Sequence, residues 1–214
     1  MNIIVTCGPS YEPIDQARRI TNFSTGRLGI LLSNALTDRG WRVYCLKGES
    51  ATCPDPVSAH QTQVFTTNQD LAGRLETLAR QTRVDAVLHA AALCDFVVAR
   101  VLDAEGREIA SPKFPTRAGR LRLDLAPAMK VLPRLRGWFP RARIVGWKYE
   151  LAGTRAEAFD RAKVQLHECQ TDACVLNGAA YGTGFAVCRP DGGVVECADP
   201  PALVNALIEL LEPR

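Results

Sequence analysis

The residues with the clearest chemical meaning lie close together near the N-terminus. Residues 18–29 read RRITNFSTGRLG, so arginines, an asparagine, hydroxyl side chains and glycines lead into an apolar pattern typical of a helix. A helix N-terminus presents unpaired backbone N–H groups and a partial positive charge, and it therefore binds anions. This arrangement predicts a binding site for the phosphates of a nucleotide.

Glycines and hydroxyl residues on both sides of this segment complete the predicted nucleotide site. An apolar strand over residues 2–7 ends in Gly8-Pro9-Ser10. Gly26 and Gly29 would let backbone approach a phosphate and let the helix pack closely on the sheet. The predicted nucleotide-binding residues of this region are Gly8, Ser10, Ser24, Thr25, Gly26, Arg27 and Gly29.

Two common nucleotide-binding motifs are missing from the sequence. The turn after the first strand holds Gly8 but no G-x-G-x-x-G pattern, and Lys47 rather than an acidic residue follows the second strand. This argues against a nicotinamide-dependent dehydrogenase. No G-x-x-x-x-G-K-[ST] sequence occurs, so the chain has no P-loop either.

Strand and helix patterns alternate along the chain. Apolar stretches predict strands at residues 2–7, 42–46, 64–66, 86–89, 121–125, 143–147 and 173–176. Periodic stretches predict helices at residues 25–37, 67–81, 127–137, 155–168 and 200–211. This order predicts one α/β domain over residues 1–214: a three-layer, doubly wound (Rossmann-like), mostly parallel sheet. Residues 185–196 predict a small C-terminal hairpin.

Ligands of doubly wound sheets bind beyond the carboxyl ends of the strands. The candidate site residues at those ends are Ala91, Ala92, Asp95, Gly146, Trp147, Lys148 and Asn177. Periodicity fails between residues 97 and 120, and a long irregular segment in a compact domain predicts a functional flap.

Composition narrows the classes of function. The net charge is +3 and the lysines and arginines are dispersed, so nucleic-acid binding is not expected. No signal peptide is visible, and no apolar run reaches the roughly 18 residues of a membrane helix, so we expect a soluble, cytoplasmic protein. The eight cysteines have no C-x-x-C spacing, which predicts buried, reduced thiols and no zinc site.

Several segments, taken in order, resemble one family. Glu12-Pro13-Ile14-Asp15, Arg18 and the run Ile20-Thr21-Asn22-x-Ser24-Thr25-Gly26-x-x-Gly29 are similar to the phosphopantothenoylcysteine synthetase (phosphopantothenate–cysteine ligase) family. Weaker matches follow in the family's order at residues 91–96, 123–132, 145–150 and 172–177. The resemblance covers nearly the whole chain.

The resemblance implies a two-step ligation in coenzyme A biosynthesis. The carboxylate of 4′-phosphopantothenate would attack the α-phosphate of CTP or ATP, with Mg²⁺, and release pyrophosphate. The amine of cysteine would then displace the nucleotide monophosphate from the acyl-nucleotidylate. The resemblance also implies a homodimer and small-molecule partners. At 214 residues the chain is too short to include the flavin-dependent decarboxylase domain that is fused to many relatives, so we expect a stand-alone form and no flavin.

The resemblance also implies roles for single residues. Asn22 would hydrogen-bond the acyl-nucleotidylate and is a catalytic candidate. Asp15 and Arg18 would bind the acid substrate together with Asn22, and Asp95 would hold the metal or the ribose. The residues that would face the base are Gly146, Trp147, Lys148 and Asn177.

Two departures from the family's pattern leave alternatives open. The family's flap lysine, just before an isoleucine that matches Ile109, is Glu108 here, so Lys113 or Lys148 is the candidate catalytic lysine. Gly178 follows Asn177 where the family has an aspartate. The alternatives are a ligase of the same fold that uses a different carboxylic acid or amine, and a nucleotide-binding protein without catalysis.

Overall fold

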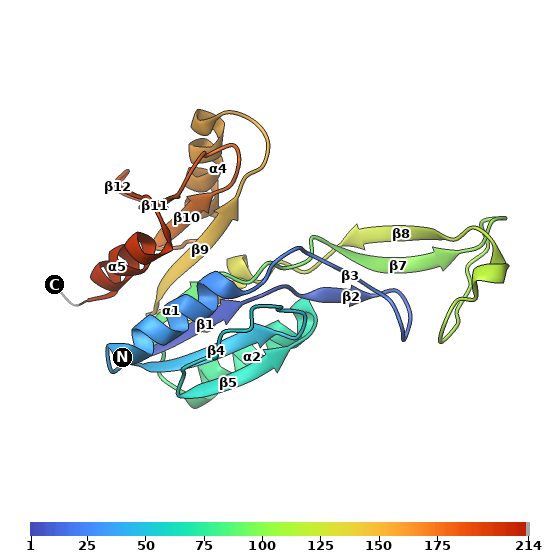
Figure 1. The fold of residues 1–214 in the computed structure, drawn as a ribbon, viewed down its shortest axis with the longest axis horizontal. Coiled ribbons are helices and arrows are strands. Elements are labelled where there is room, and N and C mark those ends of the chain that lie inside the picture. Colours follow the sequence, from blue (N-terminus) through green and yellow to red (C-terminus); the bar gives the residue numbers. More distant parts are fainter. Residues whose placement is uncertain (213–214) are drawn as a thin grey trace.

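An eight-stranded sheet forms the centre of the molecule in the computed structural model, which describes residues 1–212 (Figure 1). Its strands are β1 (Asn2–Cys7), β4 (Arg42–Gly48), β5 (Gln61–Phe65), β6 (Ala86–His89), β9 (Arg143–Tyr149), β10 (Ala173–Asn177), β11 (Phe185–Cys188) and β12 (Val194–Cys197). Their order is β12-β11-β10-β9-β6-β1-β4-β5, with parallel pairing from β10 to β5 and antiparallel pairing at β11 and β12. The predicted α/β fold with a C-terminal hairpin is confirmed, and residues 213 and 214 of the predicted domain lie outside the described residues.

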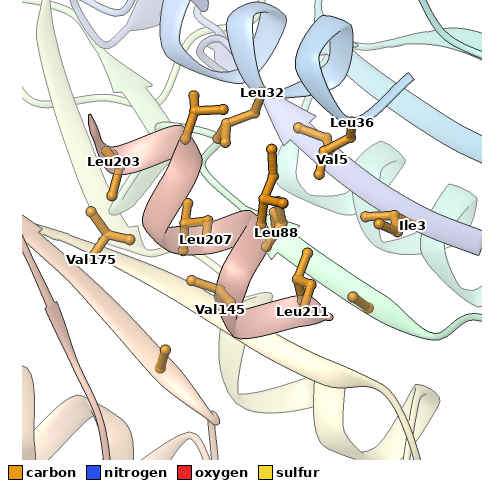
Figure 2. Close-up of a cluster of buried hydrophobic side chains, with 14 of the residues drawn as sticks. Ile3, Val5, Leu32, Leu36, Leu88, Val145, Val175, Leu203, Leu207 and Leu211 are labelled. Carbon is orange, nitrogen blue, oxygen red and sulfur yellow. The ribbon is translucent and has the colours of Figure 1, made fainter. Parts of the chain in front are cut away.

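Helices cover both faces of the sheet. One face carries α1 (Arg27–Asp38) and α5 (Pro200–Leu211), and the other carries α2 (Asn68–Gln81), α3 (Leu135–Trp138) and α4 (Arg155–Glu168). Figure 2 shows the first interface, where Val5, Leu88 and Val145 of the sheet pack against Leu32 of α1 and Leu207 of α5. Each such buried side chain contributes about 1.5–3 kcal/mol of transfer free energy, so these layers hold the strand ends in fixed positions.

A two-stranded ribbon projects from this three-layer body. It consists of β7 (Phe96–Leu102) and β8 (Arg122–Pro127), paired antiparallel, with a short 3₁₀ turn η1 (Thr116–Ala118) between them. We call residues 96–127 the arm. A hairpin of β2 (Tyr11–Pro13) and β3 (Arg19–Thr21) extends in the same direction and contacts β7 (Figure 1).

The predicted helix at residues 127–137 is wrong in its first part, because helical structure begins only at Leu132. Strand β8 continues to Pro127, and only η2 (Leu132–Arg134) and the single turn α3 are helical. The backbone between them makes other contacts: Ala128 N donates to Asp95 O at 2.8 Å, and the buried Asn68 amide donates to Met129 O at 3.0 Å. These tertiary bonds outweigh the local helical pattern.

Other departures concern elements whose partners are distant in sequence. Residues 97–102 of the predicted flap belong to β7, because β8 pairs with them, and the β2–β3 hairpin was not predicted. The predicted strand at residues 64–66 is Gln61–Phe65 in the structure. The helices predicted at 155–168 and 200–211 are confirmed, and side-chain caps from Thr154 and Asp199 start them.

Two predictions from composition can be compared with the structure. All eight cysteines are buried and unpaired, as predicted. Within residues 1–212, no helix has both the length and the apolar character of a membrane span.

Candidate functional site

A close contact between two loops forms the first wall of the site. Gly26 is the N-cap of α1 with φ 78°, and a Cβ there would lie 3.2 Å from Gly8 Cα. A Cβ on Gly29 would lie 2.2 Å from Cys7 Cβ. Helix α1 therefore packs closer to β1 than any side chain would permit, and this confirms the close packing expected of Gly29.

The predicted hydroxyl residues lie at the start of α1. Ser24 N donates to Asn22 O at 2.9 Å, and Arg27 N donates to Thr25 Oγ1 at 3.3 Å. Thr25 and Arg27 are exposed, and the first turn of α1 has no acidic side chain. The positive end of the helix dipole is therefore available to an anion.

Asn22 joins this wall to the end of β6. Its Nδ2 donates to Ala92 O at 3.2 Å and to Leu93 O at 2.9 Å, although the residue itself is exposed. Two predicted sets of residues, one after β3 and one after β6, thus meet at the Asn22 side chain.

Ser10 has a structural contact that was not predicted. Its buried hydroxyl donates to Asn68 Oδ1 at 2.7 Å and accepts from Cys94 N at 2.8 Å. The Ser10 hydroxyl thus donates one hydrogen bond and accepts another inside the protein. The predicted contact of this side chain with a nucleotide does not fit this arrangement. Asn68 also donates to Cys94 O at 2.8 Å and to Met129 O at 3.0 Å, so it fixes both chain segments at the base of the arm.

Sequence reasoning missed Asn68. It follows Thr67, the N-cap of α2, and a polar residue at that position is ordinary in a helix start. No sequence signal marked it as buried, because its three partners come from distant loops.

A cavity of about 430 Å³ opens between the ends of β6 and β9 and helix α4. Among the predicted site residues it is lined by Ala91, Asp95, Trp147 and Lys148. The other lining residues that matter for its chemistry are His89, Cys94, Met129, Lys130, Arg161, Gln165 and Glu168.

Opposite charges are paired at two points around this cavity. Glu150 bridges two cations, with Lys148 Nζ at 3.3 Å and Arg161 Nε at 2.6 Å from its carboxylate. Lys130 Nζ pairs with Asp95 on the opposite segment. A cavity with three cationic side chains on its wall suits a ligand that carries phosphate.

Strand β9 sends its alternate side chains to opposite faces of the sheet. Gly146 faces α4, where a Cβ would lie 2.9 Å from Gln165 Nε2. Trp147 packs against the core between the sheet and α1 and α5, so its ring is not placed on the same face as Lys148. The two residues predicted to face one base together are thus divided between the two faces, although both line the cavity.

Gly178 has a structural reason for being glycine. Its φ is 112°, and a Cβ would lie 2.3 Å from Glu150 O. Glu150 N also donates to Asn177 O at 2.8 Å. The departure from the family's aspartate therefore lets the turn after β10 approach the backbone of Glu150, which holds Lys148 and Arg161.

His89 and Cys94 are buried groups on the cavity wall. Burial lowers the pKa of His89 to about 4, and its Nδ1 shares a hydrogen bond of 2.8 Å with Thr6 Oγ1. Burial also raises the pKa of the Cys94 thiol, which disfavours the nucleophilic thiolate. Both groups are neutral near pH 7, which fits packing roles for them.

The structure places Asp15 and Arg18 against the arm. Asp15 Oδ1 accepts from Ala17 N and Arg18 N at 2.8 Å, and Oδ2 accepts from Phe114 N at 3.2 Å. Arg18 Nη2 donates to Phe114 O at 2.6 Å. Lys113 therefore lies beside these two predicted substrate-binding residues and does not line the cavity that holds Lys148.

Hydrogen bonds also set the charge of Asp15. Burial opposes ionisation of its carboxyl, but the three backbone N–H groups and the Arg18 charge outweigh burial and lower its pKa. Asp15 is ionised near neutral pH and works as a clamp on the segment around Phe114.

Within residues 1–212, no three His, Cys, Asp or Glu side chains gather in a way that could hold a metal ion. Asp95, the predicted metal ligand, is exposed and paired with Lys130. This donor set fits an ion that is held mainly by nucleotide phosphates and water, with a single carboxylate from the protein.

Comparison with known proteins gives consistent results. The family model described as DNA/pantothenate metabolism flavoprotein C-terminal domain matches residues 1–196. The chain is 30% identical over 191 residues to the coenzyme A biosynthesis bifunctional protein CoaBC of Mycobacterium tuberculosis, covering 89% of this chain and 44% of that protein. Against CoaBC of Thermococcus kodakarensis it is 29% identical over 176 residues, covering 82% and 40%. The chain thus spans less than half the length of these relatives.

Solved structures share the fold. The DNA/pantothenate metabolism flavoprotein from Streptococcus pneumoniae superposes with a TM-score of 0.86 at 21% identity, covering 99% of this chain and 98% of that chain. A Cab2 variant in complex with phosphopantothenate-cysteine has a TM-score of 0.74 at 16% identity, covering 98% and 86%. From the family match and the identity to CoaBC, the chain belongs to the family of DNA/pantothenate metabolism flavoprotein C-terminal domains.

Proposed function

We propose that this chain is a nucleotide-dependent ligase that joins 4′-phosphopantothenate to cysteine through an acyl-nucleotidylate. The position of Asn22 carries this proposal. Its amide contacts the end of β6 while its backbone belongs to the loop that starts α1, so it lies between the anion-binding turn and the cavity. The names of the CoaBC relatives and of the Cab2 complex support the same chemistry.

The charges of the site fit the first step. A carboxylate must approach the α-phosphate of a nucleoside triphosphate, and these two anions repel each other. Lys148 and Arg161 on the cavity wall offset this repulsion and stabilise the charge that develops as pyrophosphate leaves. Mg²⁺ held on the phosphates would neutralise further charge, with Asp95 as the protein ligand.

The second step forms the amide. The amine of cysteine attacks the acyl carbon, the bond between that carbon and the phosphate oxygen breaks, and the nucleoside monophosphate leaves with this oxygen while the nitrogen loses a proton. Asn22 places a neutral amide beside this centre: its Nδ2 is used by Ala92 O and Leu93 O, so its Oδ1 remains to accept a hydrogen bond from the reacting groups without adding charge. Of the two candidate lysines, we assign Lys148 to the reacting groups, because Lys113 lies on the arm beside Asp15 and Arg18.

The test is pyrophosphate release by the purified chain with Mg²⁺, 4′-phosphopantothenate and cysteine, run in parallel with CTP and with ATP. We expect release that requires phosphopantothenate, and a cysteine adduct in the mass spectrum. The two parallel reactions also identify the nucleotide. Binding of a nucleotide without release under any of these conditions would contradict the proposal and favour a nucleotide-binding protein without catalysis.

A second candidate is a ligase of the same fold with a different acid or amine. Glu108, at the position of the family's flap lysine, is exposed on the arm and pairs with Leu102 in an isolated bridge. A negative charge there would disfavour an acid substrate that approaches along the arm. Pyrophosphate release with other carboxylic acids, but not with phosphopantothenate, would support this candidate.

We also propose that the chain acts in the cytoplasm as a homodimer. The arm carries exposed apolar side chains, with Phe96 52% and Leu125 47% exposed, which supports contact with a second copy. Light scattering after size-exclusion chromatography measures the mass directly, and a monomer at micromolar concentration would contradict the dimer.

A further inference from the structure

The cations on the cavity wall are not equivalent. Lys148 and Arg161 share the carboxylate of Glu150, whose side chain is only 14% exposed. Separating either cation from Glu150 would leave a poorly hydrated carboxylate with fewer partners, so these two side chains are held in place. Lys148 and Arg161 can therefore attract a bound anion without leaving Glu150.

Lys130 is held far less firmly. Its partner is Asp95, and the two side chains are 60% and 69% exposed. Exposed ion pairs contribute little to stability, because water hydrates both charges and salt screens them. Lys130 can therefore exchange Asp95 for another anion at little cost.

The backbone that carries Lys130 is fixed, although its side chain is free to exchange. Asn68 holds both Cys94 O and Met129 O, and Ala128 N donates to Asp95 O at 2.8 Å. Cys94 precedes Asp95 and Met129 precedes Lys130, so the buried Asn68 amide fixes the backbone next to both members of the ion pair. The flexible side chain starts from a fixed point on the cavity wall.

From these observations we propose that Lys130 is a phosphate-binding residue of this site: it leaves Asp95 when a nucleoside triphosphate enters the cavity and binds the phosphates. This inference rests on the proposed function, since it assumes that the cavity takes the nucleotide. The exchange replaces a carboxylate by a polyphosphate, which carries more negative charge and more acceptor oxygens for the ammonium group. Asp95 therefore competes with the ligand for Lys130.

Competition predicts opposite effects for the two partners. Without Mg²⁺, in the presence of EDTA, K130M should weaken binding of the cognate triphosphate (CTP or ATP) by about tenfold, which equals about 1.4 kcal/mol. D95N should favour binding by a few-fold more in the wild type than in K130M, because only the wild type has a Lys130 for the carboxylate to compete for, whereas a contact of Asp95 with the ribose would be lost equally in both. EDTA is essential, since it separates this competition from any contact between Asp95 and a metal.

Matched controls isolate the phosphate contact. K163M removes an exposed lysine that pairs with Asp160 on the same helix, outside the cavity lining, and should leave the affinity unchanged. K130R keeps the positive charge and should restore most of the affinity. The effect of K130M should be small for the nucleoside monophosphate, which offers fewer phosphates.

Titration calorimetry of the full chain with CTP, ATP and CMP or AMP measures these affinities. Equal triphosphate binding by the wild type and K130M overturns the inference while the proposed function stands. An equal effect of D95N in the wild type and in K130M would also overturn it, because Asp95 would then not compete with the ligand for Lys130. A wild type that binds neither triphosphate overturns the inference together with the nucleotide half of the proposed function.

Discussion

Asn22 is held by two backbone carbonyl groups, and this gives its amide an orientation that a carboxylate cannot keep. The Nδ2 group donates to Ala92 O and Leu93 O, whereas an aspartate would place a negative oxygen against both. We expect N22D to lower the rate of amide formation by about 10²-fold or more, because repulsion between the carboxylate and the two carbonyl oxygens displaces the side chain from the reacting groups. Single-turnover kinetics with separate assays of pyrophosphate and product measure it.

Asn34 offers a control for this substitution. It also donates from Nδ2 to a carbonyl, that of Pro56 at 3.1 Å, but outside the site. N34D should leave amide formation unchanged. Unaltered turnover of N22D would remove Asn22 from the mechanism.

His89 makes the stability of the protein depend on pH. Its pKa is lowered from the ordinary 6.5 to about 4 by burial, so the unfolded chain takes up a proton near pH 6.5 and the folded one only near pH 4. The folded state is therefore at full stability above pH 6.5 and loses stability as the pH falls to 4. The loss is about 3 kcal/mol, at about 1.4 kcal/mol for each pH unit.

The comparison of H89Q with the wild type checks this dependence. Urea unfolding at pH 7.5 and pH 5 should show a smaller pH effect in H89Q, which cannot take up the proton. H167Q, at an exposed histidine of α4, should behave as the wild type does. A pH effect that is the same in all three proteins would show that other groups cause it.

At the scale of elements, the contact between α1 and β1 depends on one missing side chain. A methyl group on Gly29 would meet Cys7 Cβ at 2.2 Å, so the helix must move. We expect G29A to reduce the free energy of unfolding by about 1–3 kcal/mol, the usual cost of overpacking, and to weaken nucleotide binding as the start of α1 shifts. Chemical denaturation and calorimetry measure the two effects.

Gly73 is the matched control, because it lies inside α2 with nothing within 4 Å of a Cβ. G73A should be neutral or more stable by about 0.5–1 kcal/mol, since alanine favours a helix. If G29A were as stable as G73A, the close packing of α1 on β1 would be unimportant.

The elements also show what the sequence can and cannot predict. Periodicity located α4 and α5 because their apolar faces and caps are encoded within the segments themselves. It failed at the start of the helix predicted for residues 127–137, where Asn68 and Asp95, distant in sequence, bind the backbone of Met129 and Ala128. The strand β7 was missed for the same reason, since its partner β8 lies beyond a long loop.

The candidate site shows the same division. The glycines before α1 were predictable, because the loop before α1 approaches the loop after β1 so closely that a side chain would not fit. The function of Ser10 was not, since the hydroxyl is satisfied by Asn68, whose position depends on the fold. The resemblance to a family indicated which residues belong to the site. It did not predict that Trp147 and Lys148 lie on opposite faces of the sheet.

At the scale of the whole molecule, the clamp at Asp15 ties the arm to the β2–β3 hairpin. In D15N one carboxylate oxygen becomes an NH₂ group, so the acceptor of Phe114 N–H is lost while the other oxygen can keep its bonds. We expect the segment around Phe114 to open more often. Trypsin should then cleave after Lys113 several times faster than in the wild type, as measured by mass spectrometry.

D38N changes an exposed aspartate at the end of α1 and should not alter this cleavage. Protonation of Asp15 acts in the same direction as D15N. Because the pKa of Asp15 is lowered, the clamp should hold through mildly acidic conditions and open only at low pH. Equal cleavage rates in D15N and the wild type would show that other contacts hold the arm.

The base of the arm has a consequence for how this family can diverge. Because Ala128 N bonds to Asp95 O, the two ends of the arm already touch, and the path from β6 to α3 is closed without it. We therefore expect that the arm can be lengthened, shortened or replaced without rebuilding the body. Residues at its tip can then change with the substrate or the partner, while the start of α1 and the cavity stay the same.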